Sequence, residues 1–274
     1  MWYNFFETKE KKLKYVLLTG AYGGMGRAVL SALKKAGYFV FAADKTVGEA
    51  EENVLPIQTD ITNSDSVRAA FKVVAEKTDR LYAIIHLAGI YCLDSLAEID
   101  EEKFLRAFDV NVFGAYRINK YFLPLLKNGR IVIVTSELAP LEPLPFTGIY
   151  AVTKSTLDKY AYSLRMELQL LGIKVSVLRP GAVETKLLGD STAELDKFCE
   201  STQLYSCNAE RFKRIVDSVE ARSVKPERVA AKMLKIISAK RPKYVYKLNR
   251  NPLLLLLNML PKRVQTRIIK RILK

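Results

Sequence analysis

The chain has 274 residues, 49% of them hydrophobic, and its 44 Lys and Arg residues against 29 Asp and Glu residues give a formal net charge of +15. No uninterrupted apolar stretch reaches the roughly 18 residues that a membrane-spanning helix needs. This composition excludes an integral membrane protein and predicts a globular chain built as one large domain with one core.

Cysteine and histidine usage limits the chemistry and the compartment. The three cysteines are odd in number and lack C-x-x-C spacing, so neither a disulfide framework nor a zinc knuckle is expected, and a reducing cytoplasm suits them. His86 is the only histidine, which excludes a multi-histidine metal site; no metal is expected, and a histidine-based triad could form only around this residue. The first residues include Glu7 and Glu10 and do not resemble a signal peptide.

The excess positive charge is concentrated at the C-terminal end. Residues 240–274 carry eleven of the fifteen excess positive charges and no acid, which leaves four for the rest of the chain. The basicity therefore belongs to a tail. We expect a domain over residues 1–250 followed by a basic amphipathic helical tail over residues 251–274.

From the N-terminus, short β-rich runs alternate with segments of helical periodicity. Strands are predicted at residues 14–19, 38–44, 54–60, 81–89, 130–136 and 173–180. Helices are predicted from a glycine cluster to Gly37 and at residues 64–77, 104–126 and about 148–171. Strands separated by single helices pair in parallel through right-handed crossovers, so the sequence predicts an α/β fold with a doubly wound parallel sheet and ligands at the carboxyl ends of its strands.

Residues 185–222 interrupt this alternation and are predicted to form a lid at the ligand edge of the sheet. Bulky apolar residues are scattered there among polar ones, namely Leu187, Leu188, Phe198, Leu204, Tyr205 and Phe212, and LEPLPF at 141–146 adds more near the same edge. This bulk favours a hydrophobic ligand over a sugar. The alternative is that these side chains only pack the lid.

A glycine cluster, TGAYGGMG at 19–26, lies between the first predicted strand and a helix. Backbone amides there attract a pyrophosphate, although a glycine motif alone is equally a tight turn. Asp44 ends the second strand 18 residues beyond Gly26, where a carboxylate accepts hydrogen bonds from both adenosine-ribose hydroxyls and repels a 2′-phosphate. This favours NAD over NADP, while Lys45 keeps NADP open. Two further strand ends would adjoin the cofactor. Asp60–Ile61 would flank the adenine, and Ala88–Gly89 would let the cofactor pass close to the backbone. Each of these pairs alone is more often an ordinary loop feature.

Tyr150 and Lys154 lie four residues apart in GIYAVTK at 148–154, within a predicted helix. Positions i and i+4 share a helix face, so the two side chains would be neighbours. A free tyrosine, with a pKa of about 10, is a poor base, and a nearby lysine lowers that pKa by favouring the phenolate. The pair suits removal of an alcohol proton, although the same spacing is common on exposed helix faces.

Together these motifs resemble the short-chain dehydrogenase/reductase family in its single-domain branch, and are similar to those of hydroxysteroid and retinol-type dehydrogenases. The resemblance covers about residues 13–250. It rests on TGAYGGMG, Asp44, Asp60, LAG at 87–89, NVFG at 111–114, the Ser136 region, YAVTK at 150–154 and RPGAVET at 179–185. It implies a Rossmann-like fold and an NAD(P)-dependent oxidoreductase acting on CH-OH groups.

The resemblance also implies a role for each matching residue. Tyr150 would be the general acid/base. Lys154 would lower the pKa of Tyr150 and hold the hydroxyls of the nicotinamide ribose. Ser136 hydrogen-bonds the substrate oxygen, and Asn111 holds a water in the proton relay. The cofactor would contact Gly20, Tyr22, Gly24, Met25, Gly26, Asp44, Asp60, Ile61, Ala88, Gly89, Tyr150, Lys154, Pro180, Val183 and Thr185, the last at its carboxamide.

Two departures from the family pattern affect the site. Leu87 stands where the family commonly has an asparagine, so a supporting hydrogen bond is absent or supplied differently, and His86 before it is interpreted as structural. The family's serine usually lies about thirteen residues before the tyrosine, whereas Ser136 lies fourteen before Tyr150, and a count without a gap falls on Glu137. Because an anionic glutamate would repel a developing alkoxide, we predict Ser136, with a one-residue bulge in the following loop.

The tail begins with PLLLLLNMLP at 252–261, which is too short to span a bilayer. In the following KRVQTRIIKRILK, Val264, Ile268 and Ile272 recur every four residues among basic residues. Such a cationic amphipathic helix predicts peripheral contact with an anionic membrane. A subunit contact and a cover over the substrate cleft are alternatives, and no nucleic-acid-binding motif accompanies the charge, so nucleic acid is not expected as a partner.

Three functions stay open at this point. The first is an NAD(P)-dependent oxidoreductase of a hydrophobic secondary alcohol or ketone, steroid-like or lipid-like. The second, for which Lys45 argues, is an NADPH-dependent carbonyl or acyl reductase. The third is a cofactor-binding sensor or scaffold without turnover, against which the presence of Asn111, Tyr150 and Lys154 argues. By analogy with the family, the helices at 104–126 and 148–171 imply a homodimer or homotetramer.

Overall fold

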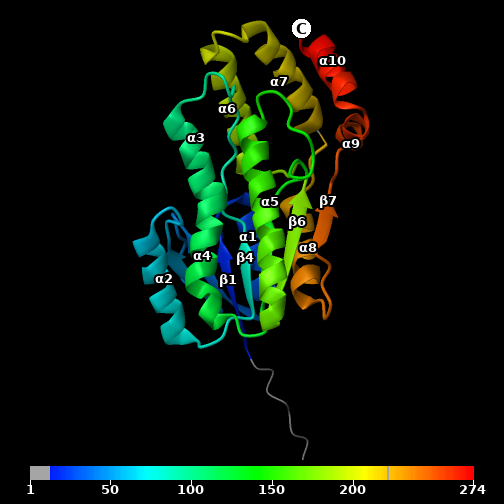
Figure 1. The fold of residues 1–274 in the computed structure, drawn as a ribbon. Helices are drawn as coiled ribbons and strands as arrows, with labels where there is room; N and C mark the ends of the chain where they lie inside the picture. Colours follow the sequence, from blue (N-terminus) through cyan, green and yellow to red (C-terminus); the bar gives the residue numbers. More distant parts are fainter. Residues whose placement is uncertain (1–12, 221) are drawn as a thin grey trace, which may run out of the picture.

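The computed structural model describes residues 13–220 and 222–274, without the side chains of 186–193 and 218–220. Its strands form one parallel sheet in the order β3-β2-β1-β4-β5-β6-β7 (Figure 1). The strands are β1 (Lys14–Thr19), β2 (Tyr38–Asp44), β3 (Val54–Gln58), β4 (Ala83–His86), β5 (Arg130–Val134), β6 (Lys174–Pro180) and β7 (Val245–Leu248). The predicted doubly wound parallel sheet is confirmed. The expectation about a signal peptide falls on residues 1–12, which lie outside the described residues.

The pairing register brings the carboxyl ends of the central strands to one edge. Thr19 at the end of β1 pairs with Ala43 of β2 and with His86 of β4, and Asp44 pairs with Gln58 of β3. The glycine cluster, Asp44 and the residues after His86 therefore leave the sheet side by side, as the predicted parallel order requires.

Helices cover both faces of the sheet, which explains why its strands are apolar on both sides. One face, with Val16 and Leu18 of β1, packs against α1 (Gly24–Lys35) and α8 (Pro226–Ser238). The other, with Leu17 of β1, packs against α2 (Ser64–Lys77), α4 (Gly114–Phe122) and α5 (Gly148–Leu168). The 3₁₀ turns η2 (Leu123–Leu125) and η3 (Gln169–Leu171) end α4 and α5.

The helix predicted at 104–126 is not continuous. The chain forms α3 (Glu101–Phe108), then a π-helical turn, η1 (Asp109–Phe113), and then α4. The wider turn inserts a residue into the helical register at Asn111, and π-turns of this kind are common at functional sites.

The predicted lid consists of α6 (Lys186–Ser201) and α7 (Ser206–Glu220), which lie over the carboxyl ends of the strands in Figure 1. Phe198 and Phe212 pack there around Phe146 of the loop after β5. The C-terminal residues form α9 (Pro252–Met259) and α10 (Lys262–Leu273). Leu273 is buried in the same cluster as Phe212, so α10 packs against the lid. None of the described helices combines the length and hydrophobicity that crossing a bilayer requires.

Candidate active site

The glycine cluster forms a turn that side chains could not enter. Gly20 has a φ of +69°, and a Cβ built on it would lie 2.6 Å from the Ala88 nitrogen. A Cβ on Gly26 would collide with the carbonyl oxygen of Gly20. These close approaches require glycine at both positions. Gly20 and Gly23 line an open cleft beside the N-terminus of α1, where helix amide groups and the helix dipole favour an anion.

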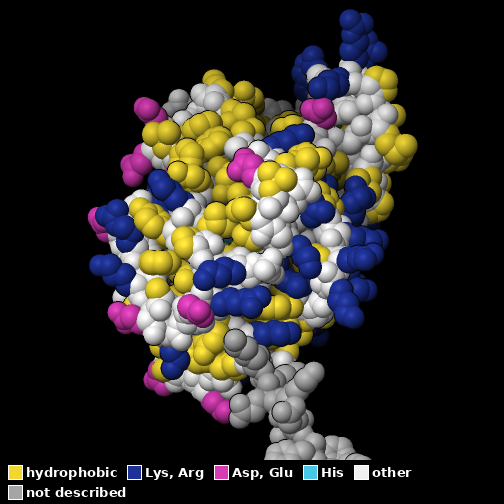
Figure 2. All heavy atoms as spheres, turned by 60° about the horizontal axis from the view of Figure 1, so that its bottom comes forward, with side chains coloured by type: hydrophobic (Ala, Val, Ile, Leu, Met, Phe, Trp, Pro, Cys, Tyr) yellow, Lys and Arg dark blue, Asp and Glu magenta, His cyan; other side chains and the backbone are white. Residues whose placement is uncertain are grey.

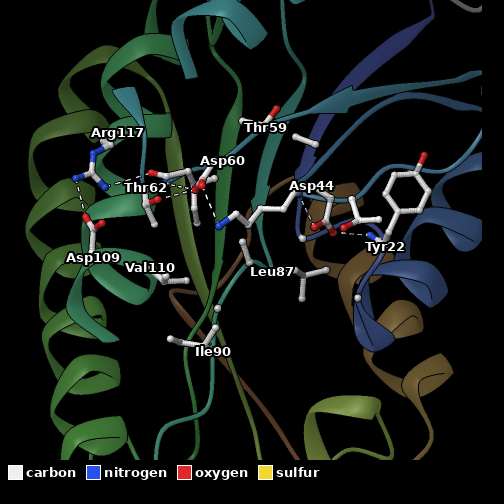
Figure 3. Close-up of a pocket in the computed structure, with 18 of the residues that line it drawn as sticks. Tyr22, Asp44, Thr59, Asp60, Thr62, Leu87, Ile90, Asp109, Val110 and Arg117 are labelled. Carbon is white, nitrogen blue, oxygen red and sulfur yellow. Dashed lines mark hydrogen bonds and ion pairs between the residues drawn. The ribbon is translucent and has the colours of Figure 1, made fainter. Parts of the chain in front are cut away.

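A cleft of about 1040 Å³ extends from this turn along the carboxyl ends of β2, β3 and β4. Asp44 faces it, and its Oδ2 accepts a hydrogen bond from the Tyr22 backbone N–H at 2.9 Å (Figure 3). Its Oδ1 accepts from the Lys45 N–H at 2.7 Å. The cleft brings together seven of the fifteen predicted dinucleotide contacts: Gly20, Tyr22, Asp44, Asp60, Ile61, Ala88 and Gly89.

Asp60 holds the ammonium of Lys45 at the far side of this cleft. The Lys45 Nζ lies 2.9 Å from Asp60 Oδ2, and Asp60 Oδ1 accepts hydrogen bonds from the N–H and hydroxyl of Thr62 at 2.9 Å and 2.6 Å. Burial acts to raise the pKa of Asp60, but the hydrogen bonds from Thr62 and Lys45 outweigh it and lower the pKa to about 2. Asp60 is therefore anionic at neutral pH, and the charge of Lys45 has a partner.

Two residues of the cleft had no signal in the sequence. Arg117 of α4 donates to the Ile61 carbonyl oxygen at 3.2 Å and pairs with Asp109 at 2.7 Å (Figure 3). Because these contacts join α4 to a loop 56 residues away, spacing along the chain could not reveal them. They fix Ile61 at the wall of the cleft.

Tyr150 and Lys154 occupy one face of α5, and that face is turned inward. Lys154 is only 6% exposed, which excludes the alternative of an exposed helix face. Its Nζ lies 5.7 Å from the centre of the Tyr150 ring, and the ring of Tyr91 lies 4.7 Å from that of Tyr150. Ser136, two residues after the end of β5, forms a side-chain hydrogen bond with Tyr150. The structure thus brings the predicted serine, tyrosine and lysine together.

Burial determines the pKa values of this pair. It raises the pKa of Tyr150 to about 12, an effect that the hydrogen bond with Ser136 opposes, and it lowers the pKa of Lys154 to about 8. The sequence leads us to expect a lowered tyrosine pKa, and in the structure desolvation reverses that direction. At neutral pH the phenol is therefore protonated and Lys154 is mostly charged.

Asn111 projects from the π-helical turn towards the same place. Its Oδ1 accepts from the Ile90 N–H at 2.8 Å, and its Nδ2 donates to the Ile90 carbonyl oxygen at 3.0 Å and to the Thr153 hydroxyl at 3.1 Å. A Cβ on Gly89 would lie 3.0 Å from Asn111 Oδ1 and 3.2 Å from Lys154 Nζ, so both groups converge on Gly89. Asn111 itself does not line either cavity described here.

A second cavity of about 230 Å³ adjoins the cleft and shares Leu87, Gly89 and Ile90 with it. It is lined by the predicted residues Met25, Ser136, Tyr150, Lys154, Pro180, Val183 and Thr185, and by Phe212 and Val216 of the lid and Leu254 of α9. Gly24 approaches this end closely, since a Cβ on it would lie 2.6 Å from Thr185 Cβ.

The comparisons with known proteins agree with this geometry. The family model described as short chain dehydrogenase matches residues 14–196. The chain belongs to the short-chain dehydrogenase family. The Escherichia coli (strain K12) protein named "Uncharacterized oxidoreductase YbbO" is 30% identical over 268 residues, which cover 94% of each chain. The recognition of the family and of an oxidoreductase is thereby confirmed.

Two further proteins show how far the likeness extends. Mouse estradiol 17-beta-dehydrogenase 2 is 35% identical over 190 residues, 64% of this chain, and the chain spans about half of that enzyme's length. The structure of the Brucella melitensis 3-ketoacyl-(acyl-carrier-protein) reductase complexed with NADH matches with a TM-score of 0.70 and 24% identity, covering 85% of this chain and 96% of that one. That likeness supports the fold.

His86 precedes Leu87, the position at which the chain departs from the family's pattern, and it lines neither of the two cavities. Its Nε2 lies 2.9 Å from Asn119 Oδ1, and Asn119 donates to the Tyr160 hydroxyl at 3.1 Å. Burial lowers the pKa of His86 to about 4, so the ring is neutral at physiological pH. The structural interpretation of this histidine is therefore confirmed.

Proposed function

We propose that this short-chain dehydrogenase is an NAD(P)-dependent oxidoreductase that interconverts a hydrophobic secondary alcohol and its ketone. One observation carries the proposal. Ser136, Tyr150 and Lys154 meet in a mostly apolar cavity that adjoins a cleft with a glycine turn and an acidic residue at its other end. A dinucleotide would reach from Asp44 to the shared wall at Gly89.

Side chains of the protein bind the substrate oxygen and transfer its proton. When bound, the nicotinamide supplies the hydride acceptor or donor. The Ser136 hydroxyl binds the substrate oxygen beside the Tyr150 phenol. The protonated phenol donates to the oxygen during reduction and must lose its proton for oxidation. The charge of Lys154 stabilises the phenolate in that direction, and we propose Asn111 as a positioning residue through Ile90 and Thr153.

The dinucleotide preference rests on Asp44, because its carboxylate would repel a 2′-phosphate while Lys45 is engaged by Asp60. We expect the enzyme to prefer NAD, and Asp44→Asn to lower the ratio of kcat/KM for NAD over NADP by about 10- to 100-fold, the scale of a charged hydrogen bond. Lys45→Ala should change the ratio less. Steady-state kinetics with both cofactors measures this. A wild-type preference for NADP would instead favour the NADPH-dependent carbonyl or acyl reductase.

The substrate class is supported by the cavity and by the names of relatives. The cavity is lined mainly by apolar side chains, among them Leu254, Phe212 and Val183. The name of the mouse relative contains the steroid estradiol, and a Bacteroides thetaiotaomicron relative is named 3-ketodihydrosphingosine reductase. A panel of steroid, retinoid and aliphatic secondary alcohols with NAD and NADP, followed at the nicotinamide absorbance band, tests the proposal. Cofactor binding without turnover of any compound would favour the sensor or scaffold.

We also propose peripheral contact with an anionic membrane through the C-terminal helices. Three apolar residues one turn apart on α9, Leu253, Leu256 and Met259, are 64%, 60% and 81% exposed. Figure 2 shows Lys and Arg side chains at the upper right of the molecule, where Figure 1 places α10. The predicted stripe of α10 is only partly available, because Ile268 is half-buried while Val264 and Ile272 are exposed. The apolar contact therefore shifts to α9.

We expect the protein to float with vesicles that contain anionic lipid, and a variant with serine at Leu253, Leu256 and Met259 to lose most of this binding. Removal of residues 262–274 should also reduce it, because the basic residues leave with α10. A matched control places serine at Leu170 and Leu171, which are 82% and 62% exposed at the end of α5. Equal flotation of all four proteins would overturn the membrane proposal.

A further inference from the structure

Glu137 is a carboxylate in the wall of the substrate cavity, one residue after Ser136. It is only 8% exposed and lines the same cavity as Tyr150. Among the described residues lining this cavity, Lys154 is the only other charged group. The ammonium of Lys154 lies over the ring of Tyr150. A buried charge in a mostly apolar cavity needs an explanation.

Hydrogen bonds within the protein provide a partner for one of the two carboxylate oxygens of Glu137. Its backbone N–H donates to the Pro180 carbonyl oxygen at 2.8 Å, which fixes the residue beside the nicotinamide end of the cavity. Its Oε2 accepts from the Asn251 N–H at 2.7 Å and so connects the loop after β5 to the start of α9. The burial of Oε2 is therefore explained by a structural role, because this oxygen holds the start of α9 in place.

The second oxygen, Oε1, lies beside Gly181, where a built Cβ would come within 2.7 Å of it. Within the described part of the chain, no group donates a hydrogen bond to Oε1, and Glu137 forms no ion pair. Burial raises the pKa of Glu137, while the Asn251 N–H and the charge of Arg250 oppose this effect. A cation inside the cavity would give the carboxylate a partner that the described residues do not supply.

We infer that Glu137 binds a primary ammonium group that the substrate carries next to its reacting carbon. The substrate class is then an amphiphilic amino alcohol or the corresponding amino ketone, with its chain in the apolar part of the cavity. Ser136 would hold the reacting oxygen, and the adjacent Glu137 the ammonium. An ionised carboxylate only accepts hydrogen bonds, and an ammonium supplies three donors and the opposite charge. This inference rests on the proposed function for the position of the reacting oxygen.

Three alcohols that differ in one group test the inference. They are 1-aminododecan-2-ol, dodecane-1,2-diol and tridecan-3-ol, which place an ammonium, a hydroxyl or a methyl group beside the same carbinol carbon. Each is measured by calorimetric binding and by oxidation kinetics near pH 7.5, where the amine is protonated. The variant is Glu137→Gln, whose amide oxygen can still accept from Asn251. The control is Glu142→Gln, an exposed glutamate in the same loop that pairs with Lys262.

We expect the wild type to bind the amino alcohol about 10- to 100-fold more tightly than tridecan-3-ol, with the same preference appearing in KM and not in kcat. Glu137→Gln should remove this preference, so that the amino alcohol and tridecan-3-ol bind with similar affinity, whereas Glu142→Gln should keep the preference. Equal binding of the three alcohols by the wild type, a diol bound as tightly as the amine, or a preference that survives in Glu137→Gln would overturn the inference. Binding that depends on Glu137 without any oxidation would instead count against the proposed function alone.

Discussion

Tyr150→Phe is expected to lower kcat by about 10²- to 10⁴-fold, the usual contribution of general acid/base catalysis. The substitution removes only the phenol oxygen, and it leaves the ring against Tyr91 and the packing of α5 in place. The substrate oxygen then has no group that can donate or take its proton. Steady-state kinetics gives kcat, and titration with the dinucleotide should show an affinity close to that of the wild type.

The matched control for this variant is Tyr162→Phe, since Tyr162 lies on the same helix and is 51% exposed. It should keep the wild-type rate. Turnover that persists in Tyr150→Phe would show that another group handles the proton, and the assignment of Ser136 and Lys154 around the phenol would lose its basis.

Asp158→Ala is expected to lower the free energy of unfolding by about 3–5 kcal/mol, because it leaves a largely buried arginine without its partner. Arg179 donates from Nε and Nη2 to the two carboxylate oxygens at 2.9 Å and 2.6 Å, and Thr135 donates to Oδ1 at 3.2 Å. The side chains of Asp158 and Arg179 are only 11% and 15% exposed. Asp158 lies one helical turn beyond Lys154, so the pair fixes α5 against β6.

Urea unfolding measures this loss, with Lys159→Ala as an exposed neighbour that should change the stability little. The double variant Asp158→Ala/Arg179→Met should recover part of the loss, since no unpaired charge is left behind. A loss below about 1 kcal/mol in Asp158→Ala, the range of exposed ion pairs, would mean that the pair is not desolvated in solution.

Periodicity along the chain predicted most of the fold because the first six strands are apolar on both faces and are mostly separated by segments with helical spacing. It missed β7, whose four residues lie in a basic segment without the length of a typical strand. It also predicted one helix where α3, the π-helical turn and α4 follow one another, because apolar spacing does not register one inserted residue. The domain boundary near 250 and the homodimer or homotetramer stay predictions.

The site shows the same division between local and distant signals. Ser136 and Tyr150 are near enough in sequence for a family pattern to pair them. The pattern alone did not decide between Ser136 and Glu137, because the spacing differs by one residue. What Glu137 does could not be predicted, because its partner Asn251 is 114 residues away and the cavity exists only in the folded chain. The direction of the Tyr150 pKa also depends on burial, which residue spacing does not report.

The central claim is that the chain moves a hydride between an alcohol carbon and a nicotinamide, and isotope transfer tests it most directly. The wild type is incubated with NAD and a hydrophobic secondary alcohol that carries deuterium on its carbinol carbon, and the reduced nicotinamide is analysed by mass spectrometry. The account predicts that the deuterium appears in the nicotinamide and that Tyr150→Phe suppresses its transfer. Reduced nicotinamide without deuterium, or transfer at the wild-type rate in Tyr150→Phe, would contradict it.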